Sequence, residues 1–193
     1  AMAVQGDVIV ACGWWGRTIR STDRGLTWTE LQVGSSEHQS VALTPSGHGM
    51  LGTNGRIQGT NNMGLSWAVL KEGTSSSAVN KMSFANNNIG VAGNGLRTTD
   101  GGRSWVTAPS GGLGVHLRSD GIGCRGGGSG SFGRTTDFFA TGINGTGPNV
   151  AIRCTWSLNA TTHIVGGGAV YGGIYRTTNN GSSWTHVLDV GNI

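Results

Sequence analysis

Short apolar runs alternate with turn-forming residues along the whole chain. In the stretch from residue 37 to 76, such runs fall at 40–44, 49–52 and 65–70, a more polar segment of the same length lies at 55–59, and Gly, Ser, Thr and Asn separate them. Runs of this length between turn residues are typical of β-strands, because amphipathic helices need longer patterns. The pattern therefore predicts four short strands in this stretch, joined by tight turns.

The glycine content strengthens the prediction of an all-β protein. The 193 residues include 37 Gly and 3 Pro, and 11% of them are charged. Each Gly inside a helix costs roughly 1 kcal/mol relative to Ala, which argues against a helical protein. The chain has no Gly-X-Y period, so it is not collagen, and seven Trp with so little charge argue against disorder. An all-β domain with many turns remains.

An eight-residue sequence recurs along the chain. Complete copies stand at 21–28 (STDRGLTW), 60–67 (TNNMGLSW), 98–105 (TTDGGRSW) and 177–184 (TTNNGSSW). A fifth copy at 135–142 (TTDFFATG) keeps the first half but lacks the Gly and the Trp. The first residues of the copies are separated by 39, 38, 37 and 42 positions. The chain therefore consists of five copies of one unit.

This octapeptide, [ST]-x-[DN]-x-G-x-[ST]-W, resembles the Asp box, or BNR repeat, and the resemblance covers essentially the whole chain. The stretches 96–105 and 174–184 are most similar to repeats of photosystem II assembly-factor propellers and sortilin-type receptor propellers. The resemblance implies an all-β, five-bladed β-propeller of four-stranded antiparallel blades, with the octapeptide between the third and fourth strands. We expect one domain, 1–193, with blades at about 1–36, 37–76, 77–110, 111–146 and 147–193. Sialidases, receptors, lectins and assembly factors all contain the box, so it indicates a fold and not an activity.

The residues of the octapeptide explain it as a turn. An Asp or Asn oxygen at position three accepts hydrogen bonds from turn amides, Gly at position five suits a positive φ, and Trp supplies apolar packing. We therefore interpret the box residues as structural and not as catalytic acids or calcium ligands. They are Asp23, Gly25, Trp28, Asn62, Gly64, Trp67, Asp100, Gly102, Trp105, Asp137, Asn179, Gly181 and Trp184.

Two departures from the repeat are informative. Arg precedes the box at positions 20, 97, 134 and 176, but Gly59 stands there in the second unit. A recurrent Arg beside a recurrent Trp and Asp is better explained as a structural partner than as an anion site. In the fourth unit, we expect Trp156 or the pair Phe138 and Phe139 to fill the space of the missing Trp.

Candidate binding residues lie on the face opposite the boxes, where the loops differ between units. Adjacent Trp14 and Trp15 stand out, because strand alternation cannot bury both rings on one side. We interpret them as an aromatic platform for a sugar ring or a partner side chain, and packing of both rings between blades is the alternative. The candidate set is Trp14, Trp15, Arg17, Asn54, Arg56, Tyr171, His38 and Glu37.

Catalysis is not expected. Without the three box Asp, six carboxylates remain, and the strand map places only Glu37 and Glu72 on the loop face. The Arg-Ile-Pro type motif of Asp-box sialidases is absent. We expect no cofactor and no metal. Cys12, Cys124 and Cys154 are odd in number and widely spaced, which favours buried free thiols over a disulfide or a metal site.

The net charge of +4 comes from scattered residues, so nucleic acid is not an expected partner, and no apolar stretch approaches the ~18 residues of a membrane helix. The expected function is recognition of a glycan or cell-surface receptor through the loop face. The composition resembles secreted or viral-fibre domains, so an extracellular or virion-associated setting is expected. A protein-docking assembly or scaffold propeller is the alternative, and a glycosidase comes third. The oligomeric state stays open.

Overall fold

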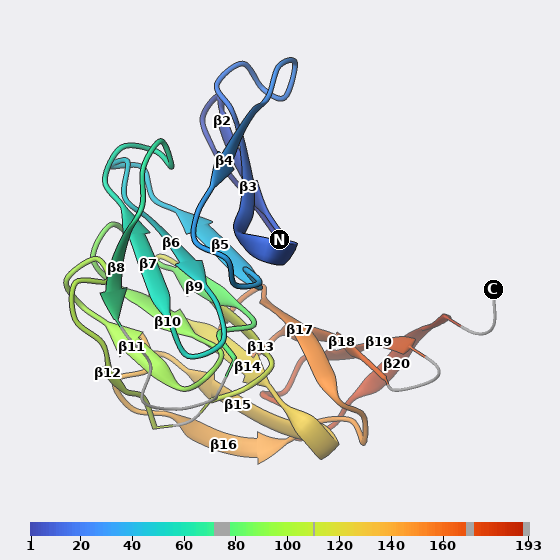
Figure 1. The fold of residues 1–193 in the computed structure, drawn as a ribbon. Coiled ribbons are helices and arrows are strands. Elements are labelled where there is room, and N and C mark those ends of the chain that lie inside the picture. Colours follow the sequence, from blue (N-terminus) through green and yellow to red (C-terminus); the bar gives the residue numbers. More distant parts are fainter. Residues whose placement is uncertain (72–77, 110, 169–171, 191–193) are drawn as a thin grey trace. The chain divides into compact units, whose positions relative to one another are not determined.

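The computed structural model describes residues 1–71, 78–109, 111–168 and 172–190 (Figure 1). In chain order, β1–β4, β5–β8, β9–β12, β13–β16 and β17–β20 form five four-stranded sheets. Strands pair antiparallel in each sheet. The strands are β1 (Met2–Gln5), β2 (Val8–Cys12), β3 (Arg17–Ser21), β4 (Thr29–Gln32), β5 (Ser40–Leu43), β6 (Gly49–Gly52), β7 (Ile57–Thr60), β8 (Ala68–Lys71), β9 (Met82–Phe84), β10 (Gly90–Ala92), β11 (Leu96–Thr98), β12 (Val106–Thr107), β13 (Gly114–Leu117), β14 (Gly123–Gly126), β15 (Ser131–Thr135), β16 (Ile143–Thr146), β17 (Ile152–Ser157), β18 (His163–Gly167), β19 (Gly172–Thr177) and β20 (Thr185–Val190). Two short 3-10 turns, η1 (Trp14–Gly16) and η2 (Gly128–Gly130), complete the elements.

The first two strands of the second sheet agree with the sequence pattern to within one residue. The third, β7, begins at Ile57 rather than at the predicted residue 55. The largest difference is at the last strand. The prediction begins that strand at residue 65, whereas β8 begins at Ala68. The difference arises because residues 65–67 still belong to the octapeptide turn. The amide of Ser66 donates to the Asn62 side-chain oxygen (3.0 Å), and the amide of Leu65 donates to the Asn62 carbonyl (3.3 Å).

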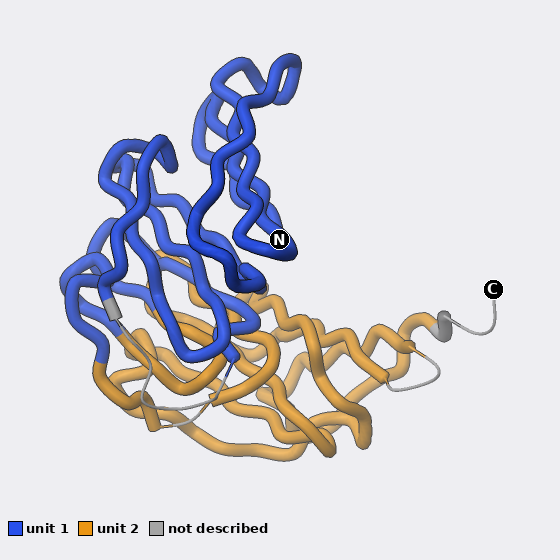
Figure 2. The backbone as a smooth tube through the Cα atoms, viewed as in Figure 1, with its two compact units in different colours: residues 1–90, 98–105 blue, residues 91–97, 106–193 orange. Residues whose placement is uncertain are grey.

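The described chain divides into two compact units, residues 1–90 with 98–105 and residues 91–97 with 106–193 (Figure 2). Within the first unit, β5 packs against β1, β2 and β9. The core between the first two sheets consists of Val10, Val33, Val41 and Leu51, and Trp67 packs against it. Neighbouring sheets are therefore joined by apolar side chains rather than by shared strands.

The second unit follows the same rule. There β17 packs against β13 and β14, and the core consists of Cys124, Phe132, Ile152 and Val165. Trp184 meets the Phe132 ring edge-on, with ring centroids 4.9 Å apart. The sheets approach so closely that a Cβ on Gly126 would stand 2.5 Å from the Cβ of Ile152. This contact explains why Gly ends β14.

The octapeptide turn is held by its own side chains. The Ser21 hydroxyl accepts the amide of Gly25 (2.8 Å) and donates to Asp23 (2.7 Å), and Asp23 accepts the amide of Thr27 (2.9 Å). Arg24 and Gly25 have φ values of 61° and 90°, so positions four and five are both left-handed. The other four copies repeat these hydrogen bonds. The sequence predicted the positive φ at position five, where Gly stands, but not the one at position four.

These hydrogen bonds lower the pKa of the Asp side chains at position three of the octapeptide. Donation by the Thr27 hydroxyl and amide, and by Ser21, lowers the pKa of Asp23 to about 2. At Asp100 burial opposes the shift, but the bonds from Ser104 and Thr98 outweigh it and bring the pKa to about 2. Where the residue is Asn, its Nδ2 donates instead to a serine hydroxyl, as Asn62 does to Ser66 (2.8 Å).

The fourth octapeptide copy replaces its missing residues in one of the two expected ways. Phe139 stands at position five with a φ of 56°, and only 2% of it is exposed. Trp156, in contrast, is 56% exposed and stacks on His116 with ring centroids 3.9 Å apart. Burial of Trp156 was therefore a wrong expectation. Because β17 turns this side chain outward, Trp156 is a candidate binding residue.

Candidate recognition site

The turn η1 presents two indole rings to solvent. It connects β2 to β3, and Trp14 and Trp15 are 66% and 74% exposed. Trp15 is left-handed (φ 55°, ψ 31°), and so is Gly16 (φ 73°). Packing of both rings between sheets, the alternative explanation of the pair, is therefore wrong.

The backbone beneath the indoles is fixed on both sides. The amide of Val33 donates to the carbonyl of Gly16 (2.8 Å), and the amide of His38 donates to the carbonyl of Gly13 (2.9 Å). The side-chain amide of Gln32 donates to the carbonyl of Trp15 (2.6 Å). These bonds join η1 to the loop at 33–38, so the indoles project from an ordered platform rather than from a free loop tip.

The turn η2 in the fourth sheet has the same backbone. Its middle residue, Ser129, has φ 51° and ψ 38°, and Gly130 has the same φ of 73° as Gly16. The amide of Gly147 donates to the carbonyl of Gly130 (2.7 Å), as the amide of Val33 does to Gly16 at η1. The amide of Ile152 donates to the carbonyl of Gly127 (2.9 Å), as the amide of His38 does to Gly13. The chain thus builds one turn twice, with Trp-Trp in η1 and Gly-Ser in η2.

This comparison shows that the turn does not require its aromatic residues. Gly and Ser fill the same two positions in η2 without loss of the backbone bonds. A left-handed conformation costs an L-residue roughly 1–2 kcal/mol. Exposed indoles bury little apolar surface, so their burial does not offset this cost. Two adjacent exposed tryptophans on an ordered turn are the kind of apolar patch that marks an interaction site.

Three other predicted site residues lie in or next to the segments around η1, with different roles. Arg17 follows the turn and is exposed, and its Nε lies 3.4 Å from Glu30. His38 is only 2% exposed, its Nε2 donates to the Val33 carbonyl (2.7 Å), and burial lowers its pKa. Its place on the binding surface was a wrong expectation, because the 33–38 loop folds the ring inward to fasten η1. The neighbouring Glu37 is half-buried.

The remaining predicted residues belong to other segments. Asn54 is exposed and forms a β-bridge with Ala78. The carbonyl of the neighbouring Thr53 accepts the amide of Val79 (3.1 Å), and the amide of Thr53 donates to the carbonyl of Arg56 (3.0 Å). The structure thus ties Asn54 and Arg56 to the segment leading to the third sheet. Tyr171 and Glu72 lie outside the described residues, so the structure places neither of them.

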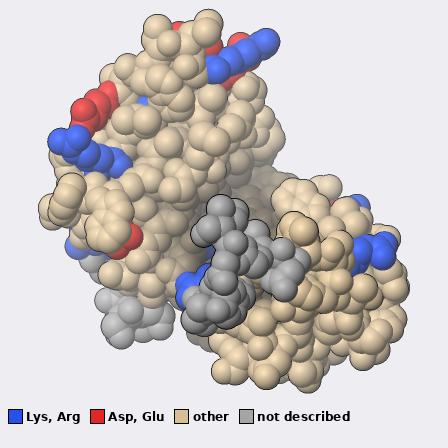
Figure 3. Space-filling model, turned by 90° about the vertical axis from the view of Figure 1, so that its right-hand side faces the viewer, with Lys and Arg blue, Asp and Glu red and all other residues tan. Residues whose placement is uncertain are grey.

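Metal ligation, membrane spanning and surface charge point to no further site in the described ranges. No group of three or more His, Cys, Asp and Glu side chains there could hold a metal ion. No helix among those residues is long and apolar enough to cross a membrane. Lys and Arg form no continuous patch on the face shown in Figure 3. The cysteines are free, but only Cys124 is buried, and Cys154 is exposed, contrary to expectation.

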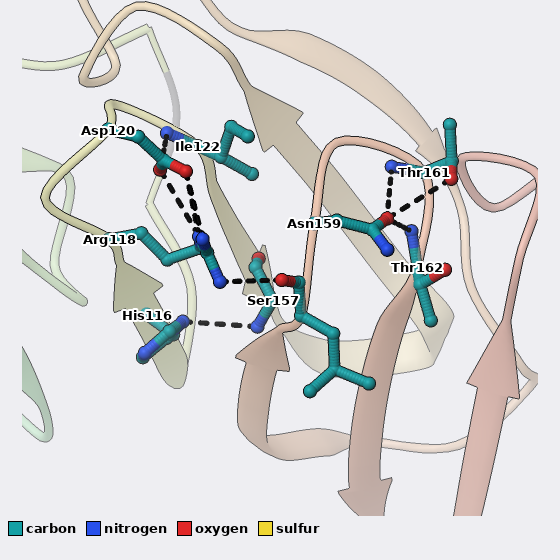
Figure 4. Close-up of polar contacts among 9 residues, drawn as sticks. His116, Arg118, Asp120, Ile122, Ser157, Asn159, Thr161 and Thr162 are labelled. Carbon is teal, nitrogen blue, oxygen red and sulfur yellow. Dashed lines mark hydrogen bonds and ion pairs between the residues drawn. The ribbon is translucent and has the colours of Figure 1, made fainter.

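A polar cluster in the second unit was not found from the sequence (Figure 4). The amide of Ser157 donates to His116 Nδ1 (3.0 Å), and Arg118 pairs with Asp120 (2.9 Å). Hydrogen bonds from Arg118 lower the pKa of Asp120. The Ser157–His116 bond joins β17 to β13, and Arg118 Nη1 donates to the carbonyl of Leu158 (2.5 Å), which joins the segments that follow these strands. These bonds support the His116–Trp156 stack. The one signal in the sequence was a Trp outside any octapeptide.

Comparison with known proteins identifies the fold. No protein-family model and no curated protein matches the chain. Among solved structures, the GH74 enzyme of Niastella koreensis is similar with a TM-score of 0.77 and 18% identity, over 96% of this chain and 37% of the enzyme. YCF48 bound to D1 peptide gives a TM-score of 0.67 at 15% identity, over 97% and 66% of the two chains. The WD40 β-propeller domain of Doa1 gives 0.67 at 11% identity, over 97% and 66%.

The five four-stranded sheets and these similarities define the class of protein. The chain is a five-bladed β-propeller, as the repeat predicted. It spans little more than a third of the GH74 enzyme and about two thirds of the other two structures. At such identities the likeness shows the fold alone, and the activity must be argued from the residues.

Proposed function

We propose that the chain is a protein-docking β-propeller, which holds a peptide segment of a partner against the exposed indoles of Trp14 and Trp15. The observation that carries the proposal is the comparison of η1 with η2. The same turn occurs in both, but only η1 carries exposed aromatic rings. The octapeptide bonds support placing the chain among the Asp-box propellers, and its charge-poor composition fits a partner outside the cell or on a virion.

The chemistry of η1 favours a protein partner. Trp and Arg are enriched among the residues that dominate protein–protein binding energy, and Arg17 follows the tryptophans directly. The YCF48 structure contains a bound D1 peptide, so a propeller of this kind has at least one peptide ligand. A glycan is the second candidate, since flat exposed indoles also suit the faces of sugar rings.

Peptide selection followed by substitution tests the proposal. A library of twelve-residue peptides displayed on phage is selected on the wild-type protein, and the Kd of selected peptides is measured. The variant Trp14→Gly with Trp15→Ser copies η2 and should keep the melting temperature. It should weaken peptide binding at least 30-fold, since hot-spot residues contribute about 2 kcal/mol or more. Leu26→Ser removes an apolar residue that is 85% exposed on an octapeptide turn and serves as the control.

The outcomes separate the two candidates. Loss of binding in the double variant but not in Leu26→Ser supports peptide docking at η1. A glycan array that binds wild type but not the double variant, with no peptide selected, replaces the proposal by the second candidate. Peptide binding that survives the double variant contradicts the site.

A further inference from the structure

An arginine latch recurs between neighbouring sheets. Arg20 on β3 donates its Nε to the carbonyl of Met63 (2.8 Å), and Arg97 on β11 donates its Nε to the carbonyl of Phe138 (2.7 Å). Each arginine directly precedes one octapeptide, but the carbonyl it reaches belongs to the next copy along the chain. Met63 and Phe138 both stand at position four of that next copy. The arginine before one octapeptide therefore binds the left-handed backbone of the next.

The second sheet lacks this arginine, and a cavity lies in its place. Gly59 on β7 has no side chain to reach Gly101, which stands at position four of the third octapeptide. A cavity of about 270 Å³ borders both residues, and all of its lining belongs to the first unit. The missing side chain explains why a cavity forms here.

One wall of the cavity is apolar. Its apolar side chains are those of Met50, Trp67, Ala68 and Leu70. Leu70 leans over Gly59, with its Cγ 2.8 Å from the point where a Cβ would stand, so it narrows the vacated space without filling it. A volume just below the usual range for drug-sized ligands suits a small ring or an amino-acid-sized molecule.

The polar groups of the cavity favour an anion. Arg103, His48, Asn61 and Ser66 offer donors, and none of the lining residues carries a carboxylate. Arg103 stands at position six of its octapeptide, where the two turns served by the latch have Leu65 and Ala140. Its Nη1 donates to the carbonyl of Asp100 (3.1 Å), which holds the guanidinium beside the cavity. A cationic ligand would meet that charge with no acidic partner.

We propose that this cavity binds a small carboxylate, whose apolar body lies against Trp67 and Leu70 and whose charge pairs with Arg103. The site is independent of η1, since none of its lining residues belongs to that turn or to the loop that fastens it. Free small carboxylates and the C-terminal carboxylate of a peptide share this chemistry.

Three isosteric probes decide the charge of the ligand. Benzoate, benzamide and benzamidinium are titrated separately while the indole N–H signal of Trp67, assigned with Trp67→Phe, is followed by NMR. Benzoate should shift this signal with a Kd at least five-fold lower than that of benzamide, and benzamidinium should bind most weakly. Benzamidinium binding more tightly than benzoate, or no shift with any probe, would overturn the proposal.

Substitutions locate the site. Arg103→Gln should remove the advantage of benzoate over benzamide, whereas Arg24→Gln, an exposed arginine of another octapeptide, should leave it unchanged. Gly59→Arg restores the latch residue and should abolish binding of all three probes. If this variant does not fold because of Leu70, the double variant with Leu70→Ala gives the arginine room. Unchanged benzoate binding in Arg103→Gln or in a folded Gly59→Arg protein contradicts the site.

A titration with a peptide tests whether the carboxylate belongs to a peptide C-terminus or to a free small molecule. N-acetyl-glycyl-phenylalanine is titrated beside its C-terminal amide. Tighter binding than benzoate, lost in the amide, assigns the cavity to a peptide C-terminus. Weaker binding than benzoate assigns it to free small carboxylates.

Discussion

At the scale of the residue, Asp and Asn perform the same task at position three of the octapeptide. Both accept the amide of position seven through Oδ1, as Asp23 and Asn62 show. They differ at the second atom, since Asp accepts from the hydroxyl of position seven whereas Asn donates to it. The hydroxyl can do either, because it is both donor and acceptor. The occurrence of either Asp or Asn at position three could therefore be predicted from the sequence.

This difference predicts a change in acid stability. The folded-state pKa values of Asp23, Asp100 and Asp137 lie below the ordinary value of 3.8. Their stabilisation is thus present above pH 4 and is lost as the pH falls towards 2. Replacing all three by Asn should leave the melting temperature at pH 7 nearly unchanged and reduce its decline between pH 4 and 2, measured by circular dichroism.

Exposed carboxylates outside the octapeptides provide the control. Asp7→Asn with Glu30→Gln removes two acids that pair with exposed arginines. If this control reduces the acid decline as much as the triple variant does, the octapeptide bonds are not its cause.

At the scale of the element, the sequence predicted strands better than turns. The strands of the second sheet followed from short apolar runs, because a strand is a local pattern. The turn η1 depends on contacts with 33–38, which lie on a different loop, so an exposed indole could be predicted but the left-handed backbone could not. A signal was nevertheless present, because Gly13 and Gly16 have the same spacing as Gly127 and Gly130. The sequence also offered no reason to expect His38 inside.

The structure of η1 predicts a large loss of stability for alanine at Gly16 and a small one at Gly13, which precedes the turn. Gly16 has a φ of 73°, and an added Cβ would stand 2.6 Å from the carbonyl carbon of Gly34. Gly16→Ala should therefore lower the free energy of unfolding by at least about 1–2 kcal/mol, measured by urea titration. An added Cβ on Gly13 meets nothing within 4 Å, and its φ of −161° is extended. Gly13→Ala should change stability little. Equal losses in the two variants would show that the close approach of Gly34 does not fix this turn.

At the scale of the whole molecule, the repeat spacing predicted five sheets because each unit of the sequence folds into one sheet. The carboxylate cavity could not be predicted in the same way. Gly59 was visible as a break in the arginine series, but its consequence depends on which carbonyl the missing arginine would reach. That carbonyl lies in the following octapeptide, 42 positions further on, and only the fold brings the two together.

The cysteines report on the folded state of the whole chain. Cys154 is exposed, whereas Cys124 is buried and burial raises its pKa to about 11. Because the thiolate is the reactive species, a disulfide reagent at pH 8 should modify Cys154 at once and Cys124 only on unfolding. Thiol counting with and without denaturant, combined with mass spectrometry, checks this order. Fast modification of Cys124 in the native protein, or fewer than three thiols in denaturant without reductant, would contradict the structure.

Under the proposed docking at η1, the duplicated turn also determines how many peptide sites of this kind one chain can carry. Since η1 and η2 share a backbone, the presence of an aromatic platform depends on two side chains and not on the fold. A chain with Trp at 128 and 129 would then carry two aromatic platforms, and one with Gly at 14 and Ser at 15 would carry none. Valency in this propeller can therefore change by point substitution, without any new loop being built.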